Sequence, residues 1–595
     1  MHRKGISRIT MAVIIAVIIV IAGVIAALLY TISPAQRPTQ TVSPPPITPT
    51  TPLAIVITTP TLTTPAFTTP VPTTFEKLLR VSFANVPYLD PAVGSDEAST
   101  VYLLNVYDTL VYPLPNGSII PHLASKWDVS PDGLVWTFYL RQGVKFHSGR
   151  ELTAYDVDFS LKRLITIGEG YAYLLAPYVD LNNTKVIDKY TIQIALKKPY
   201  ALFLQALVRL YIVDSELVRA HIKKPGPYGE MGDYGKDWLM SGEKDAGSGP
   251  YMLVKYVRGE SVTLARFKDY WGQVAPNAPD TVVMLGTTEP TTIRTLIARR
   301  ELEISDQWQP LENYDAMSKI RGVEIAKIPT AYEFYLMIHT RKPPTDDIHV
   351  RKALSYVFDY DTAIKDINPY ERRACGPVPS TLIGYNKELG CITRNVTLAM
   401  EELKKSKYYG QLDKYPIEFW WIAEVPWEER VALLFKQNAE AIGLKVNVVK
   451  KPWLSVVEAL SKPETSPNIV SIFVASDFLE AGGMLANRYH SKVAGTWQQN
   501  EWLLNSTIDR MIEDAVSTLD LQSRLEKYYE IQKIIFEMYP SIYLYEHTIL
   551  RAYQAYYVDF PAARGNVAPL LGYDLEFRWI QVYPEKRQEL LRAGG

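Results

Sequence analysis

The chain has 595 residues, which is too many for one hydrophobic core, so two or three lobes are expected. Its formal net charge is −1, from 63 Lys and Arg against 64 Asp and Glu, and it has no basic excess to neutralise phosphates. Nucleic acid is therefore not expected as a partner. The 39 Tyr and 12 Trp exceed the needs of a core, and such amphipathic rings also line binding clefts.

The first segment of note is an uncharged apolar run from Met11 to Leu29. A helix of roughly 20 apolar residues crosses the ~30 Å hydrocarbon core of a bilayer, so residues 11–32 are predicted to be a transmembrane anchor. Positive charges precede the run, which places residues 1–10 in the cytoplasm and the rest outside the cell. A cleaved secretory signal is the alternative. A third reading is a pilin-like signal, because Lys4-Gly5-Ile6-Ser7 resembles its cleavage site; such a signal is cut before the apolar run and would leave the anchor attached.

Residues 33–74 consist almost wholly of Pro, Thr and small residues. Proline removes backbone donors and fixes φ, so this segment is predicted to be an extended stalk rather than a folded domain. Sequons follow in the rest of the chain, as expected for an exported surface that carries glycans. Their asparagines are Asn116, Asn182, Asn395 and Asn505.

The folded part begins with a predicted strand at 78–84. A helix follows with Ser95 or Asp96 as its cap and Val101, Leu104 and Leu110 facing inward. A hairpin is then predicted at 127–140, since Pro131-Asp132-Gly133 is a turn sequence. Thr153 and Asp156 form a capping box that begins a helix running to about Leu164. Near the end of the chain, the pattern predicts one helix from Asp509 to Met538.

Only two cysteines occur, Cys375 and Cys391. Outside the cell such a close pair indicates a disulfide, which could contribute about 3 kcal/mol by closing a loop of this length. No His or further Cys lies nearby in the sequence to complete a metal site, so no metal is expected. Two free thiols are the alternative.

An ordered series of motifs resembles the extracellular solute-binding proteins of family 5, the oligopeptide, dipeptide and nickel class that serves ABC importers. The resemblance extends over about residues 78–577. Its motifs are Leu89-Asp90-Pro91, Tyr107 to Val111, Gly143 to Gly149, Gly247 to Tyr251, Tyr270-Trp271, Val350 to Leu354, Phe358-Asp359 and Ala441 to Val446, followed by Arg524, Tyr528, Gln532 and Pro540.

The resemblance implies an α/β fold of the two-lobed periplasmic-binding-protein type (class II, cluster C) with an inserted subdomain. Lobe I is expected at 75–118, 211–301 and 546–595, the subdomain at 119–210 and lobe II at 302–545. It also implies an extracellular monomer that captures oligopeptides or dipeptides between its lobes and delivers them to a permease with cytoplasmic ATPases. No cofactor and no enzymatic activity are expected.

The resemblance also implies a set of ligand contacts. Asp477 matches the aspartate that binds the α-amino group of the ligand, because a buried ammonium needs a charged partner. Other matching positions are Ser95, Asp96, Glu97, Ser248, either Tyr171 or Tyr173, and Trp453. For each, helix capping or packing is the competing interpretation. Trp420, Trp421 and Trp427 form the densest aromatic cluster, although neighbouring strand residues such as Trp420 and Trp421 cannot both face one cleft.

Three other functions stay open. Val474 and Glu424 depart from the peptide-binding pattern, since many members have an aromatic residue at the first position and dipeptide binders tend to have a basic one at the second. Together with the aromatic excess, these departures favour oligosaccharides as ligands. A surface receptor or adhesin could use the same fold. A surface hydrolase is the remaining class, but no H-E-x-x-H, G-x-S-x-G or P-loop motif is present.

Overall fold

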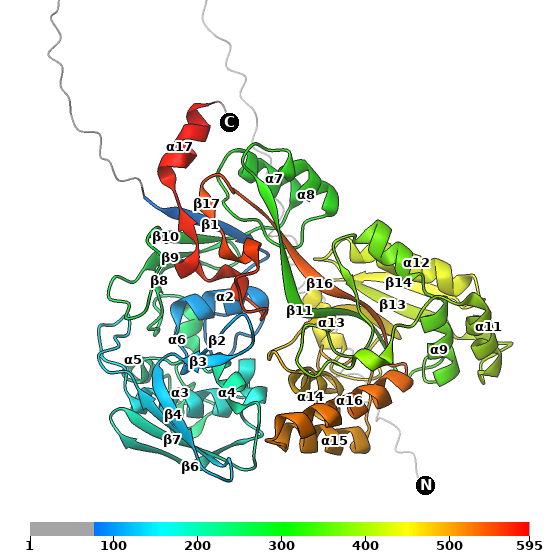
Figure 1. Cartoon of the computed structure of the whole chain (residues 1–595), viewed down its shortest axis with the longest axis horizontal. Helices are drawn as coiled ribbons and strands as arrows, with labels where there is room; N and C mark the ends of the chain where they lie inside the picture. Colours follow the sequence, from blue (N-terminus) through cyan, green and yellow to red (C-terminus); the bar gives the residue numbers. More distant parts are fainter. Residues whose placement is uncertain (1–75, 594–595) are drawn as a thin grey trace, which may run out of the picture. The chain divides into compact units, whose positions relative to one another are not determined.

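Two long antiparallel strands, β11 (Glu324–Ile338) and β16 (Ser541–Tyr553), join the two lobes of the protein. The computed structural model describes residues 76–593. In Figure 1 the two strands run side by side from the region of α7 and α8 into the sheet of lobe II. Their pairing is irregular between Pro329 and Glu333. These strands are therefore the connection on which any movement between the lobes depends.

Lobe II is built around a six-stranded sheet of order β12-β16-β11-β15-β13-β14. Its strands are β12 (Arg372–Arg373), β13 (Ile417–Ile422), β14 (Val446–Lys451) and β15 (Ile469–Ala475), with β11 and β16. Both faces are covered by helices, so the central strands are buried on both sides and have nearly continuous apolar sequences. One face packs against α9 (Ile348–Val357), α10 (Tyr360–Thr362), α11 (Val396–Lys405) and α12 (Glu428–Glu440). The other packs against α13 (Trp453–Ala459), α14 (Ala481–Tyr489), α15 (Ser506–Ser517) and α16 (Leu521–Glu537).

Lobe I is built around the four-stranded sheet β1-β10-β9-β8. Its strands are β1 (Leu78–Phe83), β8 (Tyr251–Val257), β9 (Ser261–Arg266) and β10 (Thr281–Gly286). The C-terminal segment returns to the same hydrophobic core as β1. It contains β17 (Val558–Asp559), β18 (Gln581–Val582) and α17 (Pro584–Arg592). Helices α7 (Pro290–Ala298) and α8 (Leu311–Ser318) share a small core with the outer ends of β11 and β16.

The segment between β1 and β8 carries a second four-stranded sheet, β4-β5-β7-β6, which we call the subdomain. Its strands are β4 (Ala124–Val129), β5 (Val135–Leu140), β6 (Val179–Asp188) and β7 (Thr191–Leu196). The short strands β2 (Val111–Pro113) and β3 (Ile119–Pro121) precede this sheet in the chain. Helix α3 (Ala154–Ile167) lies between β5 and β6 in the sequence. Three short helices follow β7: α4 (Phe203–Ala206), α5 (Ser215–Ala220) and α6 (Lys236–Ser241). The architecture is the mixed α/β, two-lobed arrangement expected from the sequence. The predicted domain boundaries at 118, 210, 301 and 545 stay a proposal.

The predicted start of the first helix is confirmed, but its extent is not. α2 (Glu97–Val106) is capped by Asp96, whose Oδ1 accepts the Ser99 N–H at 3.0 Å. The helix ends at Val106 because that carbonyl accepts the N–H of Gly249 at 2.9 Å. Leu110 is therefore buried in the segment after the helix rather than on its inner face.

The capping box of α3 is present: Asp156 Oδ2 accepts the Thr153 N–H at 2.9 Å. The hairpin is also present, as β4 and β5. The single helix predicted at 509–538 is instead two helices, α15 and α16. The helical conformation is interrupted at residues 518–520, and Asp520 caps α16 by accepting the Ser523 N–H at 2.8 Å. An aspartate at this position offers the backbone an alternative to continuing the first helix.

Cys375 and Cys391 form a disulfide, as predicted, with their Cα atoms 4.4 Å apart. Two of the four sequon asparagines begin helices: Asn395 Oδ1 accepts the Leu398 N–H at 2.9 Å, and Asn505 Oδ1 accepts the Thr507 N–H at 3.0 Å. Capping is sufficient reason for asparagine at these two positions. Glycosylation at all four positions stays a prediction.

The predicted anchor at 11–32 and stalk at 33–74 lie outside the described residues. Within 76–593, no helix has both the length and the apolar character needed to cross a bilayer.

Candidate ligand-binding site

Asp477 lies where the two lobes meet, just beyond the end of β15. Its side chain is buried, and Oδ2 accepts hydrogen bonds from the Asn487 amide of α14 at 2.6 Å and from the Tyr173 hydroxyl at 2.7 Å. Tyr173 belongs to a short 3₁₀ helix of the subdomain side, Gly170–Leu174, so this bond joins the lobes. Burial raises the pKa of Asp477, while the positive charge of Arg209 and the two hydrogen bonds act in the opposite direction. The carboxylate is thus a buried acceptor at the lobe interface.

The start of α2 approaches the same interface. Ser95 O accepts a hydrogen bond from the Tyr171 hydroxyl at 3.3 Å. The second oxygen of Asp96, Oδ2, is buried and has no hydrogen-bond partner among the described residues. Burial raises the pKa of Asp96. These contacts place the first turn of α2 beside the tyrosine segment that reaches Asp477.

Glu97 joins three distant segments of the chain. Its Oε1 accepts a hydrogen bond from Arg551 Nη2 of β16 at 3.0 Å, and its Oε2 accepts one from Gln307 Nε2 at 2.5 Å. Arg551 Nε also donates to Asp574 Oδ2 at 2.7 Å. Burial raises the pKa of Glu97 to about 7, although Arg551 opposes the shift. The network ties the beginning of α2 to one of the two strands that connect the lobes.

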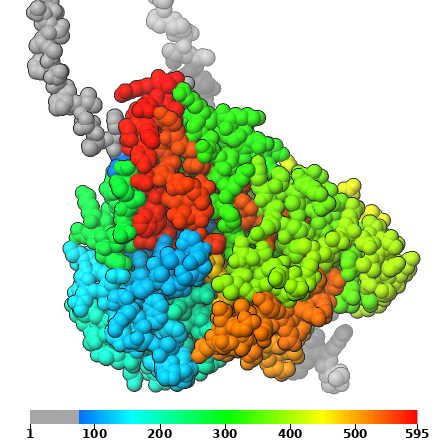
Figure 2. All heavy atoms as spheres, in the orientation of Figure 1, coloured from blue at the N-terminus to red at the C-terminus, as the bar shows by residue number. Residues whose placement is uncertain are grey.

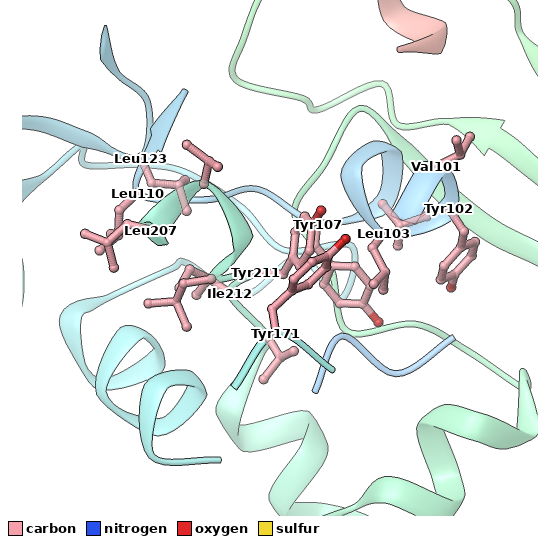
Figure 3. Close-up of a cluster of buried hydrophobic side chains, with 14 of the residues drawn as sticks. Val101, Tyr102, Leu103, Tyr107, Leu110, Leu123, Tyr171, Leu207, Tyr211 and Ile212 are labelled. Carbon is pink, nitrogen blue, oxygen red and sulfur yellow. The ribbon is translucent and has the colours of Figure 1, made fainter. Parts of the chain in front are cut away.

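Arg209 is a charged residue of this interface that the sequence reasoning missed. It is fully buried, with its guanidinium 5.0 Å from the ring centre of Tyr171 and 5.5 Å from that of Tyr573. Figure 3 shows the neighbouring Leu207 and Tyr211 in the same cluster as Tyr171 and the residues of α2. The sequence did contain a signal for a buried arginine, since Arg209 is the only charge in the apolar run 206–213. Such a run is normally buried, and a charge within it is then buried too.

Ser248 is not brought together with these residues. Its hydroxyl donates to Asp108 Oδ2 at 3.0 Å, in a buried cluster of lobe I. The turn around Ser248 packs against the C-terminal end of α2, because the Gly249 N–H donates a hydrogen bond to Val106 O. Ser95 to Glu97 lie at the opposite, N-terminal end of this helix. Ten helical residues at 1.5 Å each separate the two ends by about 15 Å. A ligand beside Asp477 and α2's first turn would therefore be about one helix length from Ser248.

The predicted aromatic residues of lobe II mostly belong to its cores. Trp420 and Trp421 are buried on opposite faces of the sheet, as strand alternation requires. Trp427 packs against Phe334 and Phe473, with ring centres 5.2 and 5.5 Å apart.

Trp453 and Glu424 contact each other at the start of α13. The exposed Glu424 accepts the Trp453 backbone N–H at 3.0 Å, and the Trp453 ring lies 5.4 Å from that of Trp497. Within residues 76–593, no hydrogen bond or ring contact links either residue, or the three tryptophans of the cores, to Asp477. These side chains are accounted for by packing and by holding α13 in place.

The lobes are also in contact away from Asp477. The backbone N–H of Ala201 donates to Val516 O of α15 at 3.0 Å. Figure 2 shows the blue and cyan surface of lobe I and the subdomain meeting the orange surface of α15 and α16. The two lobes therefore touch at α15 as well as at Asp477.

The family model for bacterial extracellular solute-binding proteins, family 5 (middle), matches residues 118–494. The chain is 25% identical over 468 residues to the probable D,D-dipeptide-binding periplasmic protein DdpA of Escherichia coli, covering 77% of this chain and 86% of that one. It is 28% identical over 494 residues to di/tripeptide-binding protein 2 of Pseudomonas aeruginosa, covering 78% and 87%.

A solved structure with the same fold is that of the periplasmic binding protein DppA of Helicobacter pylori in complex with the peptide STSA. The TM-score is 0.73 at 22% identity, covering 85% of this chain and 98% of that one. The two-lobed periplasmic-binding-protein fold predicted from the sequence is thus confirmed. The match of the family model over more than half of the chain decides the family: this protein belongs to the bacterial extracellular solute-binding proteins of family 5.

Proposed function

We propose that the protein is the substrate-binding component of an ABC importer and captures peptides between its two lobes. The observation that carries the proposal is the buried Asp477, which lies at the lobe interface and is hydrogen-bonded to Tyr173 of the opposite lobe. A peptide ammonium beside this carboxylate would contact both lobes and so favour their closed arrangement. The names of relatives that bind dipeptides and tripeptides support the same class of ligand.

Two of the features that favoured oligosaccharides have another explanation. The oligosaccharide alternative rested on an aromatic excess, but Trp420, Trp421 and Trp427 are occupied in packing. It also rested on Glu424, which accepts the backbone N–H of Trp453. A surface receptor or adhesin, or a hydrolase, has no observation in its favour.

A ligand screen tests the proposed function directly. Full-length protein in detergent would be heated with pooled dipeptides, tripeptides and tetrapeptides, and separately with cello-, xylo- and malto-oligosaccharides. A bound ligand raises the unfolding temperature, by a free energy that grows as RT ln(1 + [L]/Kd). We expect the peptide pools to raise it and the sugars to leave it unchanged. A shift with sugars alone would contradict the proposal, and the absence of any saturable shift would favour an adhesin.

Replacing Asp477 by asparagine is expected to weaken peptide binding by about tenfold to hundredfold, because the ligand ammonium would be buried without a counter-ion. The measurement is isothermal titration of the wild type and the variant with the tightest peptide from the screen. N-acetylated peptide, which has no ammonium, should bind both proteins equally. The exposed Asp413→Asn serves as the control variant. Unchanged affinity in Asp477→Asn would mean that this carboxylate is structural.

We further propose that the apolar segment at 11–29 anchors the protein in the cell membrane, with the binding domain outside and the stalk at 33–74 between them. Support comes from the length of the run and from the positive charges before it. The native protein is expected in the membrane fraction and to resist extraction with alkaline carbonate. A soluble native protein whose N-terminus lies within the stalk would contradict the anchor.

A multi-span permease with cytoplasmic ATPases is the proposed partner. A solute-binding domain captures its ligand but does not move it across a membrane, and the sequence contains no P-loop that would supply ATP hydrolysis. The binding protein is proposed to act as a monomer that docks on the permease.

A further inference from the structure

The turn that carries Asp477 lies between β15 and α14 and comprises residues 476–480. Its last residue, Glu480, comes immediately before the first residue of α14. Asn487, two helical turns further along α14, donates the hydrogen bond that reaches Asp477 Oδ2 at 2.6 Å. The position of the Asp477 carboxylate therefore depends on where α14 begins and on how this turn is held.

Glu480 is a buried carboxylate whose side chain is bound by another helix. Its Oε1 accepts hydrogen bonds from Arg524 Nε at 2.7 Å and from the Tyr528 hydroxyl at 2.8 Å, and its Oε2 accepts one from Arg524 Nη2 at 3.2 Å. The residue before a helix often caps the first turn of that helix with its side chain, but Glu480 makes no such bond. Glu480 instead ties the start of α14 to α16.

Arg524 and Tyr528 belong to a stripe on α16 that also includes Gln532. The three residues are spaced by four, so they lie on one face of the helix, and all three are buried. Gln532 Nε2 donates to the carbonyl of Gly384 at 2.7 Å, in the loop that the disulfide closes. Figure 1 shows α16 beside α14. One face of α16 thus binds both the start of α14 and the disulfide-closed loop.

The disulfide-closed loop also contacts the Asp477 turn directly. The Ile383 N–H donates to Leu479 O at 3.1 Å, and the Ala481 N–H donates to Ile383 O at 2.8 Å. These two backbone hydrogen bonds lie on either side of Glu480 in the sequence, and its side chain is bound by α16. The end of the turn is therefore fixed twice, through its backbone by the loop and through the Glu480 carboxylate by α16.

We propose that Glu480 is a positioning residue of the ligand-binding site, which holds the Asp477 carboxylate in place for the ammonium of a peptide. The inference rests on the proposed function. A turn that is ordered before the ligand arrives removes part of the conformational entropy that binding would otherwise cost. The Glu480 carboxylate is occupied by Arg524 and Tyr528, so its effect reaches the ligand only through Asp477. A ligand without an ammonium gains nothing from this arrangement.

The test compares two forms of one peptide on full-length protein in detergent. The probe is the tightest-binding peptide from the pooled screen, used with a free N-terminus and as its N-acetyl derivative. The variants are Glu480→Gln, which removes the charge that binds Arg524, and Tyr528→Phe, which removes one hydroxyl. The matched control is Tyr529→Phe, because the Tyr529 hydroxyl makes no hydrogen bond to the described residues. Isothermal titration gives each affinity, and thermal unfolding shows whether each variant is folded.

Wild-type protein should bind the free peptide about tenfold to hundredfold more tightly than the N-acetyl form. Glu480→Gln should weaken the free peptide by about tenfold and leave the N-acetyl form unchanged, and Tyr528→Phe should have the same effect at about threefold. Combining Glu480→Gln with Asp477→Asn should give the affinity of Asp477→Asn alone, because both residues act through one contact. Tyr529→Phe should behave as the wild type.

The proposal is overturned if Glu480→Gln weakens both forms by the same factor, since such a residue only stabilises lobe II. It is also overturned if this variant keeps the full preference for the free peptide. If Glu480→Gln does not fold, Tyr528→Phe decides the matter, because its ring still fills the core, and a full wild-type preference there contradicts the proposal. A wild type that binds no peptide defeats the proposed function, whereas a preference that survives both variants defeats only the role of Glu480.

Discussion

Replacing Arg551 by methionine is expected to lower the free energy of unfolding by about 3–5 kcal/mol, because it leaves the buried Asp574 and the largely buried Glu97 without their counter-ion. Arg551 is fully buried and donates to Asp574 at 2.7 Å and to Glu97 at 3.0 Å. It connects β16 to the start of α2 and to the C-terminal segment. Urea unfolding of the full-length protein in detergent measures the loss.

The loss in Arg551→Met should depend on pH. The pKa of Glu97 is about 7 in the folded protein against a usual 4.5, so the folded state holds this proton more tightly than the unfolded chain does. Folded stability from this group is present below pH 4.5 and is lost as the pH rises through about 7. Without Arg551 the pKa of Glu97 rises further, because the charge that opposed the shift is gone. The difference between wild type and variant should therefore be smaller at pH 5 than at pH 8.

The control for this prediction is Arg564→Met. Arg564 pairs with Asp559 on the surface, where its side chain is 62% exposed. Surface ion pairs contribute about 0–1 kcal/mol, so this variant should unfold almost as the wild type does at both pH values. A loss in Arg551→Met that is the same at pH 5 and pH 8 would contradict the assignment of the pH dependence to Glu97.

Arg163→Met is expected to have a comparable effect, about 3–5 kcal/mol, in lobe I. The Arg163 guanidinium, on α3, donates two parallel hydrogen bonds to Asp90 at 2.6 and 2.5 Å, and both residues are buried. Asp90 is the middle residue of the Leu89-Asp90-Pro91 motif. The substitution would leave the Asp90 carboxylate buried with only the Ala92 N–H, at 2.9 Å, as a close donor among its bonds to the described residues.

The neighbouring Lys162→Met is a matched control on the same helix. Lys162 forms a half-buried pair with Asp158, one helical turn away, worth about 0.3–0.5 kcal/mol. Adding Asp90→Asn to Arg163→Met should recover part of the stability, because the buried charge is then removed as well. Equal losses in Arg163→Met and Lys162→Met would show that the buried pair contributes no more than a surface pair.

Features that depend on neighbouring residues could be predicted from the sequence. The capping box of Thr153 and Asp156 involves residues three apart, and the hairpin depends on a turn of three residues. The opposite orientation of Trp420 and Trp421 follows from strand geometry alone. The family could be predicted because its motifs keep their order along the chain. The break between α15 and α16 was local too, and Asp520 was its unused signal.

The composition of the site depended on the tertiary structure. Glu97 forms one network with Arg551 and Asp574 although it lies hundreds of residues before them in the chain, and Tyr173 contacts Asp477 across the two lobes. The sequence by itself places charges such as Arg209 within apolar segments, which is a signal that they are buried. Which charge lies near which was decided only by the path of the chain through both lobes, because an ion pair depends on distance in space and has no periodicity in sequence.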